Sequence, residues 1–392
     1  MNMQACSLDL WRQIMKNILL VDDSALMRRV LCDIIESDKR FRVQDRAVNG
    51  LDALSLLSRK TYDAVVLDVN MPQMNGLELL KELQKRKISA KIIMASTATA
   101  DGAKTTLDAL ELGALDFIHK PTSALDCRNG TFSQGLLQIL AAVTDADTLT
   151  PTPMPAPTPP VTSPRAGTIR SVPGRMGAAA AVEKKPPVTA PPSGKAVYNP
   201  GSQIVALASS TGGPKALQAV IPKLPANLKV PVVVVQHMPA GFTASLAERL
   251  NSLSEVTVKE AAEGDVLMPG TVYVSMGGKH MNVLNMSGKY TIHYSDEPAR
   301  EGVKPCANYM YESLMDSRFD RIVCVVMTGM GADGTEGIVH LKEKKKIHVI
   351  VQEASTCAVY GMPKSAVNAG LADQIVPLEQ IAQEITTNVG VK

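Results

Sequence analysis

A proline-rich stretch limits what this chain can fold into more than any other feature. Residues 151–200 contain 13 of the 25 prolines, several of them in runs such as Pro-Thr-Pro-Met-Pro-Ala-Pro-Thr-Pro-Pro. Because proline lacks an amide donor and favours extended backbone, this stretch cannot build a packed core. We therefore predict a folded domain on either side of it. The predicted division is an N-terminal extension over 1–15, with Met15 as an alternative start, a first domain over 16–125, a flexible linker over 126–200 and a second domain over 201–392.

The charge of the chain is concentrated in the linker. The formal net charge is +3, from 41 Lys and Arg against 38 Asp and Glu. Residues 151–200 hold 6 basic and 1 acidic side chains, whereas 1–150 and 201–392 each carry a net charge of −1. Two slightly acidic domains argue against a nucleic-acid partner. The linker itself is either a passive spacer or a docking segment for an acidic partner.

Cysteine spacing and hydropathy indicate the cellular compartment. The six cysteines form no Cys-x-x-Cys pair, which argues against a disulfide framework and a structural zinc site and suits a reducing cytosol. No apolar run approaches the ~20 residues that span a bilayer. Asp9 and Arg12 interrupt the N-terminal segment, which therefore does not resemble a signal peptide. We expect a cytoplasmic monomer that is not inserted in a membrane.

The first domain alternates short apolar runs with amphipathic helical patterns. The apolar runs predict buried strands over 17–21, 64–68, 91–96 and 116–120, and helices are predicted from Ala25, after an N-cap at Ser24, and over 76–83. Strands that alternate with helices are typical of parallel sheets with crossover connections. The pattern predicts a doubly wound α/β fold.

Several polar residues in this domain follow directly on predicted strands. In a parallel sheet such residues meet at the edge formed by the carboxyl ends of the strands. They are Asp22, Asp23, Asp68, Ser96 or Thr97, and Lys120. Three neighbouring carboxylates need a cation, and oxygen ligands of this kind suit Mg²⁺. Any one aspartate alone is better explained as a loop residue or helix cap. The whole set predicts a site in which Asp68 accepts a phosphoryl group.

The motifs around these residues resemble the receiver domain of two-component response regulators. They are Val21-Asp22-Asp23-Ser24, Leu67-Asp68-Val69-Asn70-Met71-Pro72-Gln73-Met74-Asn75-Gly76 and His119-Lys120-Pro121. The resemblance implies a flavodoxin-like fold, phosphotransfer from a chemotaxis histidine kinase to Asp68, and Mg²⁺ on Asp22, Asp23, Asp68 and Asn70. It also implies that Ser96 is the switch hydroxyl, Phe117 the switch aromatic residue and Lys120 a phosphoryl-binding residue. Asn75 stands where the family usually has aspartate, and either residue suits a turn.

The second domain repeats the strand-and-helix pattern with a different set of polar residues. Predicted strands over 204–208, 232–236 and 321–327 are followed by a serine pair, by His237 and by Asp333, and a helix is predicted to open at Pro214. Serine needs a histidine to take its proton, and a carboxylate holds that histidine in the right tautomer. Ser210, His237 and Asp333 at one edge of a sheet therefore predict acyl transfer. Glycines beside them allow sharp turns and exposed amides that can form an oxyanion hole.

Other interpretations of these residues are open from the pattern alone. The sequence from Ala208 to Gly212 is not the Gly-x-Ser-x-Gly elbow, and the order Ser, His, Asp differs from that of α/β-hydrolases. The Ser-Thr-Gly-Gly-Pro-Lys segment could cradle a phosphate, although it lacks the P-loop spacing. His280 is the main rival to His237 as base, and Asp333 could simply be a turn residue.

Residues 202–388 resemble the catalytic domain of the chemotaxis protein-glutamate methylesterase family. The motifs are Ala208-Ser-Ser-Thr-Gly-Gly-Pro214, Gln236-His-Met-Pro-Ala-Gly-Phe-Thr243, Pro269-Gly-Thr-Val-Tyr273, Thr328-Gly-Met-Gly-Ala-Asp-Gly334, Gln352-Glu-Ala-Ser355 and Gly361-Met-Pro363. The resemblance implies that Ser210 is the nucleophile, His237 the base, Asp333 the orienting acid and the Met330 amide an oxyanion donor. It implies no cofactor in the esterase site. Ser209 is expected only to support the turn.

A receiver followed by this domain is the arrangement of that family. It predicts a phosphorylation-activated serine hydrolase that demethylates glutamate methyl esters of methyl-accepting chemoreceptors, deamidates their glutamines and so mediates sensory adaptation. A non-catalytic phospho-signalling adaptor is the alternative. A transcriptional regulator is disfavoured, because residues 201–392 are rich in strands and net acidic.

Overall fold

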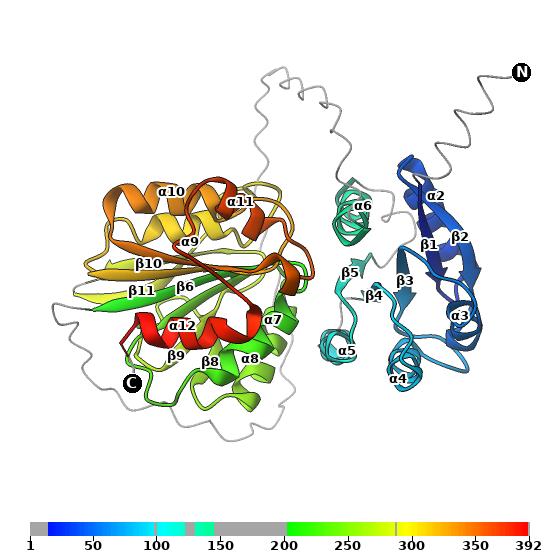
Figure 1. Ribbon diagram of the computed structural model, residues 1–392, viewed down its shortest axis with the longest axis horizontal. Helices are drawn as coiled ribbons and strands as arrows, with labels where there is room; N and C mark the ends of the chain where they lie inside the picture. Colours follow the sequence, from blue (N-terminus) through cyan, green and yellow to red (C-terminus); the bar gives the residue numbers. More distant parts are fainter. Residues whose placement is uncertain (1–14, 98–99, 122–129, 145–201, 287, 391–392) are drawn as a thin grey trace, which may run out of the picture. The chain divides into compact units, whose positions relative to one another are not determined.

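The computed structural model describes residues 15–97, 100–121, 130–144, 202–286 and 288–390 (Figure 1). Residues 1–14 of the predicted extension over 1–15 and the proline-rich stretch over 151–200 lie outside the described residues. The described residues form two α/β domains. No helix in these described ranges is long and apolar enough to cross a membrane.

The N-terminal domain contains a five-stranded sheet in the order β2-β1-β3-β4-β5. All neighbouring strands are parallel. The strands are β1 (Lys16–Val21), β2 (Phe41–Ala47), β3 (Ala64–Asp68), β4 (Ile92–Thr97) and β5 (Asp116–Lys120). This order is that of the flavodoxin-like doubly wound fold, so the predicted fold class is confirmed. β1 and β3 are buried Val, Ile and Leu runs because helices cover both faces of the sheet.

Among the described residues, helices flank both faces of this sheet (Figure 1). One face carries α2 (Ala25–Ser37) and α6 (Gly130–Thr144), and the other carries α3 (Gly50–Leu57), α4 (Gly76–Arg86) and α5 (Ala100–Glu111). Ser24 caps α2 as predicted, since its hydroxyl accepts a hydrogen bond from the Met27 amide. Asn75 and Glu78 form a reciprocal capping box at the start of α4, which explains why asparagine serves at position 75.

Four elements of this domain were not named in the sequence prediction: β2, α3, α5 and α6. β2 was missed because Phe-Arg-Val-Gln-Asp-Arg-Ala alternates polar residues along an edge strand and has no apolar run. α6 lies inside the range 126–200 that was assigned to the linker, yet Phe132, Leu136 and Leu140 are buried in the same apolar cluster as Ile18 and Ile93. The described core of the domain therefore extends to Thr144. The proline-rich composition begins only at residue 151, after this helix.

The C-terminal domain contains a seven-stranded sheet in the order β14-β13-β12-β6-β7-β9-β8. All its neighbouring strands are parallel. The strands are β6 (Gln203–Ser209), β7 (Val232–Gln236), β8 (Thr257–Glu260), β9 (Thr271–Val274), β12 (Arg321–Val326), β13 (Ile347–Gln352) and β14 (Gln374–Val376). β6, β7 and β12 match the predicted strands. An antiparallel hairpin is formed by β10 (His280–Met286) and β11 (Lys289–Ser295).

Helices cover both faces of this second sheet (Figure 1). α7 (Gly213–Val220), α8 (Phe242–Leu253) and α12 (Ile381–Asn388) bury one apolar cluster, whereas α9 (Ala307–Ser313), α10 (Thr335–Lys344), α11 (Met362–Asn368) and the hairpin bury the other. Short 3₁₀ turns are η3 (Ile221–Lys223), η4 (Ala354–Thr356) and η5 (Leu378–Gln380). Alternate residues of β6 contribute to the two clusters, with Ala206 on one side and Leu207 on the other. The chain therefore forms a second doubly wound domain.

The strand order places the candidate catalytic residues on neighbouring strands. β6 comes first in the sequence of the domain but lies in the middle of the sheet, between β12 and β7. The chain proceeds outward from β6 in both directions, so the order reverses beside it, and ligands of doubly wound proteins bind where the order reverses. Ser210 follows β6, His237 follows β7, and Asp333 lies in the segment after β12.

Candidate functional site

Ser210 lies on the sharp turn that joins β6 to α7. Its amide donates to the Thr328 carbonyl (3.0 Å), and its own carbonyl accepts from the Gly213 amide (2.7 Å), which closes the turn. Gly212 has a φ of +75°, a left-handed conformation that favours glycine. Ser210 is half-buried, whereas Ser209 is fully buried. The turn therefore presents Ser210 at the carboxyl edge of the sheet.

His237 and Asp333 are joined by a short hydrogen bond. His237 Nε2 lies 2.7 Å from Asp333 Oδ2. Both side chains are largely buried, with side-chain exposures of 10% and 3%. Water therefore competes little for this contact, and the ring of His237 is held in one orientation.

Asp333 is surrounded by hydrogen-bond donors. Besides His237, it accepts from the amides of Ala307 (2.6 Å) and Asn308 (2.9 Å) at the start of α9 and from the Cys306 thiol (3.0 Å). Burial acts to raise the pKa of Asp333, but His237 and the other donors outweigh it, so the pKa lies below its ordinary value. The carboxyl group is therefore ionised and able to stabilise an imidazolium.

The other ring nitrogen of His237 takes no part in the contact with Asp333. Because Nε2 contacts Asp333, Nδ1 is the nitrogen that this contact leaves open. Among the described residues no hydrogen bond joins the Ser210 hydroxyl to His237, as is common before substrate binds. His280, the rival base, is fully buried at the start of β10, and its Nε2 lies 3.2 Å from the Pro298 carbonyl. It contacts neither Ser210 nor Asp333 in any described interaction.

The loop after β12 carries the predicted oxyanion donor. Both backbone groups of Gly329 are hydrogen-bonded, its amide to Val359 and its carbonyl to Gly361 and Met362. A Cβ at Gly329 would lie 2.7 Å from Ser210 Cβ, so only glycine allows this approach. Within the described ranges, no hydrogen bond occupies the amide of Met330, the next residue. That amide therefore remains available to a ligand.

Two buried glutamines support the site and were not predicted as functional. Gln236 ends β7 and hydrogen-bonds Ser209, the Ser210 carbonyl and the His237 carbonyl. Gln352 ends β13, accepts from the Thr328 amide (2.8 Å) and donates to the Thr356 carbonyl (2.8 Å). The available signal was a lone polar residue at the end of each run of apolar strand residues. Ser209 donates to Gln236, which agrees with a supporting role for that serine.

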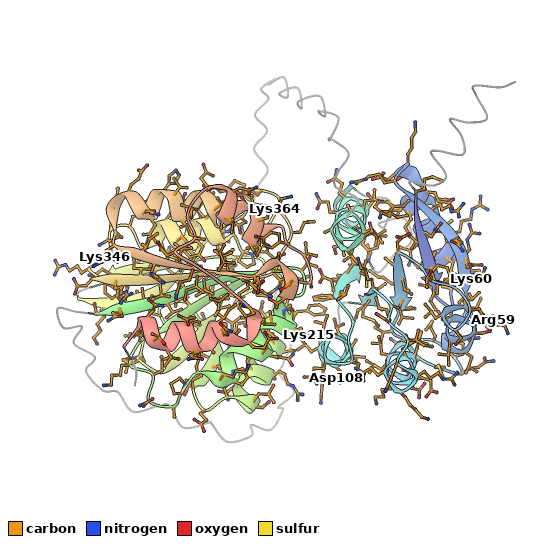
Figure 2. The ribbon with its side chains drawn as sticks, in the orientation of Figure 1. Arg59, Lys60, Asp108, Lys215, Lys346 and Lys364 are labelled. Carbon is orange, nitrogen blue, oxygen red and sulfur yellow. The ribbon has the colours of Figure 1, made fainter. Side chains whose placement is uncertain are left out.

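Two exposed lysines lie near the starts of the helices that follow the Ser210 turn and the Gly361 segment. Lys215 and Lys364, both labelled in Figure 2, are in the first turns of α7 and α11. α7 begins directly after the Ser210 turn, and Met362 at the start of α11 lies close to Gly329. A cation is unfavourable near a helix N-terminus, so these positions gain nothing from the helix dipole.

The N-terminal domain holds an acidic cluster at the carboxyl edge of its sheet. Oxygen atoms of Asp22, Asp23 and Asp68 all lie within 4.8 Å of one another. Lys120 is buried and donates to Asp22 Oδ2 (2.6 Å) and Asp68 Oδ1 (2.9 Å). Burial raises the pKa of Asp68, although the ammonium group of Lys120 opposes this rise. These oxygens are ligands of the kind that Mg²⁺ prefers.

The remaining predicted residues of this domain lie on the strands and loops around the cluster. Ser96 is buried on β4, Phe117 is buried on β5, and Asn70 is exposed in the loop after β3. β4 pairs with β5 in a register that sets Ser96 opposite His119. The side chain of Thr97, the alternative hydroxyl, lies outside the described residues.

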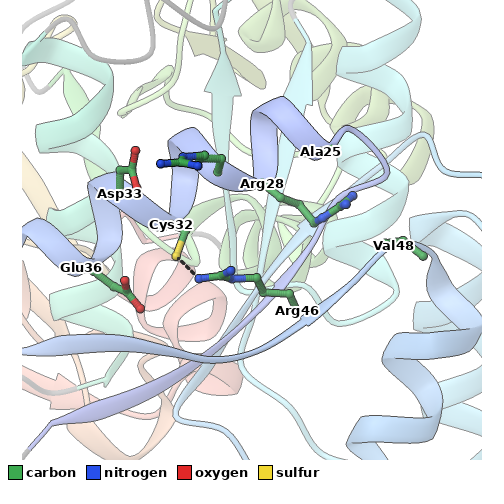
Figure 3. Close-up of a pocket in the computed structure, with 8 residues that line it drawn as sticks. Ala25, Arg28, Cys32, Asp33, Glu36, Arg46 and Val48 are labelled. Carbon is green, nitrogen blue, oxygen red and sulfur yellow. Dashed lines mark hydrogen bonds between the residues drawn. The ribbon is translucent and has the colours of Figure 1, made fainter.

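A pocket of about 540 Å³ opens between α2 and β2 (Figure 3). Arg28, Arg29 and Arg46 line it together with Asp33 and Glu36. The Arg46 guanidinium donates to the buried Cys32 thiol (2.7 Å), as the dashed line in Figure 3 marks. Arg28 also donates to the Asp22 carbonyl (2.6 Å), so this wall of the pocket is joined to the acidic cluster.

Fold and site together define a class of protein. The first domain has the sheet order and acidic edge of a response-regulator receiver, and the second is a doubly wound domain with a serine, a histidine and an aspartate at neighbouring strand ends. The chain is a receiver joined to a hydrolase domain of the serine type.

Comparison with known proteins identifies the family. The profile of the CheB methylesterase family matches residues 205–385, and that of the response regulator receiver domain matches residues 18–129. A protein-glutamate methylesterase/protein-glutamine glutaminase of Geobacillus kaustophilus is 38% identical over 95% of this chain and 98% of its own length. Its counterpart in Bacillus subtilis is 39% identical over 96% of this chain and 99% of its own length. The chain belongs to the protein-glutamate methylesterase/protein-glutamine glutaminase family.

Solved structures are similar to the two domains separately. The catalytic domain of Thermotoga maritima CheB methylesterase is 40% identical, covers 48% of this chain and 98% of its own, and has a TM-score of 0.47. The response regulator domain of Thermotoga maritima CheB is 37% identical, covers 34% of this chain and 98% of its own, and has a TM-score of 0.30.

Proposed function

We propose that Ser210, His237 and Asp333 form the triad of a phosphorylation-activated esterase that demethylates glutamate methyl esters and deamidates glutamines in chemoreceptors. The observation that carries the proposal is the 2.7 Å contact between His237 Nε2 and Asp333 Oδ2 beside the Ser210 turn. It supplies an oriented base next to a hydroxyl, which is what acyl transfer from serine requires.

The first half of the reaction acylates the enzyme. Ser210 Oγ attacks the γ-carbonyl carbon of the methyl ester while His237 Nδ1 takes the hydroxyl proton. The Met330 amide donates to the oxyanion that develops, and Asp333 stabilises the imidazolium. Methoxide then leaves with the proton from His237 as methanol, and the glutamyl group remains as an ester on Ser210.

The second half regenerates the enzyme. Water attacks the glutamyl-serine ester, His237 takes a proton from the water and returns it to Ser210 Oγ, and the product glutamate leaves. With glutamine as substrate the first leaving group is ammonia and the second half is the same.

The first domain is proposed to control this activity. Asp22, Asp23, Asp68 and Asn70 would hold Mg²⁺, whose charge offsets the approach of an anionic phosphoryl group to these carboxylates. A histidine kinase of a chemotaxis pathway is the proposed phosphodonor, with Asp68 Oδ as the attacking atom and Lys120 as a donor to the phosphoryl oxygens. Ser96 and Phe117 are proposed to report phosphorylation by changing conformation.

We propose a domain division modified by α6. The receiver then spans residues 16–144, the linker 145–200 and the catalytic domain 201–392. The unphosphorylated receiver is proposed to restrain the catalytic domain, and phosphorylation shifts the equilibrium towards the active state. Addition of a small-molecule phosphodonor should raise methanol release by the full chain, and Asp68→Asn should abolish the response. Equal stimulation of the variant would contradict this regulation.

A single substitution tests the esterase assignment. Ser210→Ala should take up phosphate normally from a phosphodonor yet release no methanol from receptor membranes whose glutamates carry labelled methyl esters. Methanol release near the wild-type rate by Ser210→Ala would contradict the assignment of Ser210 as the nucleophile. Absence of release from the unsubstituted chain, with and without phosphodonor, would instead favour a non-catalytic adaptor.

A further inference from the structure

We infer that Gln236 is a positioning residue that holds the nucleophile and the base of the esterase at a fixed separation. The inference goes beyond the proposed function by adding a residue to the machinery, and it rests on that function for its activity assay. Gln236 touches no reacting atom. It acts through the backbone of the two residues that do.

The hydrogen bonds of Gln236 join both catalytic strands. Its Nε2 donates to the Ser210 carbonyl (2.9 Å) and to the His237 carbonyl (3.0 Å). Its Oε1 accepts from the Ser209 hydroxyl (2.7 Å). Both protons of the amide are therefore used, and one side chain ties the turn after β6 to the residue after β7.

The strand register places Gln236 where it can do this. Ser209 and Gln236 pair in the parallel ladder of β6 and β7, and the His237 amide donates to the Ser209 carbonyl (3.1 Å). The pairing of β6 with β7 ends at this pair, and Ser210 and His237 follow it directly. The Gln236 amide adds a side-chain hydrogen bond to the carbonyl of each of these two residues at the point where the chain turns away from the sheet.

Burial makes these bonds costly to lose. Gln236 is 1% exposed, so water cannot easily replace a missing partner. Gly213 fits closely against it, because a Cβ at that position would lie 2.0 Å from Gln236 Oε1. The rotamer of Gln236 is thus fixed by packing as well as by hydrogen bonds. A shift of about 1 Å between reacting groups costs about a hundredfold in rate.

The chemistry of the amide separates positioning from simple space filling. Gln236→Met keeps the volume and removes all three hydrogen bonds. Gln236→Glu keeps the shape, but an ionised carboxylate has no proton to donate and would face two carbonyl oxygens. A protonated carboxyl group restores one donor, and burial raises the pKa of such a group. The activity of Gln236→Glu should therefore rise relative to that of wild type as the pH falls.

Two readouts on the full chain test the inference. One is methanol release from methylated receptor membranes, resolved into kcat and KM. The other is the rate at which a fluorophosphonate probe labels Ser210, which reports nucleophile activation without the physiological substrate. Gln236→Met should lower kcat and the labelling rate about 10- to 100-fold and change KM less than about threefold. The labelling rate and kcat of Gln236→Glu, each divided by the wild-type value at the same pH, should rise as the pH falls from 8 to 6.

Matched variants complete the design. Gln203→Met, at the far end of β6, should leave both readouts within twofold of wild type. Ser209→Ala should lower the labelling rate and kcat of the otherwise wild-type chain. Added to Gln236→Met it should lower them no further, because the two residues share one hydrogen bond.

The inference is overturned if the labelling rate and the kcat of Gln236→Met are both within twofold of wild type. It is also overturned if Gln203→Met lowers these two rates as much as Gln236→Met does. Should Gln236→Met fail to fold, the pH trend of Gln236→Glu decides, and a ratio independent of pH overturns the inference. Probe labelling of the unsubstituted chain without methanol release would refute the esterase assignment while leaving Gln236 testable by labelling.

Discussion

His237 Nε2 lies 2.7 Å from Asp333 Oδ2, so the proposed catalytic base is oriented by the nitrogen that serine proteases usually turn to their nucleophile. Asp333 follows β12 and His237 follows β7, while Ser210 lies on the turn after β6, the strand between them. Nδ1 is therefore the nitrogen left for the proposed contact with Ser210.

Replacing Asp333 by asparagine should remove the charge and leave the shape. The amide can present its NH₂ group to His237 and so hold the wrong tautomer, which costs about 10⁴-fold in kcat in a serine triad. We expect a loss of that size in methanol release. Asp296→Asn, an exposed substitution in the same domain, is the control and should keep full activity. A loss below tenfold in Asp333→Asn would argue against Asp333 as the orienting acid.

The same residue should link stability to pH. Because the pKa of Asp333 is lowered by folding, the native state binds fewer protons than the unfolded state near that pKa. Its contribution to stability is thus complete above the ordinary aspartate pKa and is lost as the pH falls through the lower folded value. The free energy of unfolding of wild type should exceed that of Asp333→Asn by about 1–3 kcal/mol at pH 6, and this difference should shrink towards pH 3. Urea denaturation at each pH measures it, and a constant or growing difference would contradict the shift.

A single methyl group at Gly213 should disturb the nucleophile. Its Cβ would lie 2.0 Å from Gln236 Oε1 and 2.9 Å from Ser209 Oγ, so Gln236 must move. Gly213→Ala should cost about 1–3 kcal/mol of stability, as overpacked cores do, and should lower kcat more than it raises KM. Gly135→Ala in α6 is the control, since its Cβ would make an ordinary 3.7 Å contact. Wild-type turnover by a folded Gly213→Ala would count against the close packing.

The receiver cluster should bind Mg²⁺ more tightly without Lys120. The ammonium group lies 2.6 Å from Asp22 Oδ2 and 2.9 Å from Asp68 Oδ1, where it competes with a cation for the same oxygens. Lys120→Met should lower the Mg²⁺ dissociation constant about tenfold, or ~1.4 kcal/mol, by titration calorimetry. The substitution should also slow phosphorylation of Asp68, because a hydrogen-bond donor to the phosphoryl oxygens is lost. Lys60→Met removes a surface pair with Asp45 and should leave Mg²⁺ affinity unchanged.

Prediction from sequence succeeded where a segment has one strong pattern. β1, β3, β6 and β7 are runs of apolar residues that end in polar ones, and such runs fit only buried parallel strands. Prediction failed where tertiary packing overrides the local pattern. The polar residues of β2 form a strand because β1 offers a free edge to pair with, and α6 is a helix because its apolar face is covered by the sheet.

The sequence by itself determined the two α/β domains and named Asp68, Ser210, His237 and Asp333 as candidates, because strand ends and residue chemistry are local properties. Only the tertiary structure decided which strands are neighbours, which nitrogen of His237 contacts Asp333 and that Gln236 bridges two strand ends. Those relationships join residues 26 or more positions apart, and they depend on strand order and side-chain burial, which no local pattern encodes. The proline-rich stretch separated the domains in the sequence, but the packing of α6 moved the described end of the first one to Thr144.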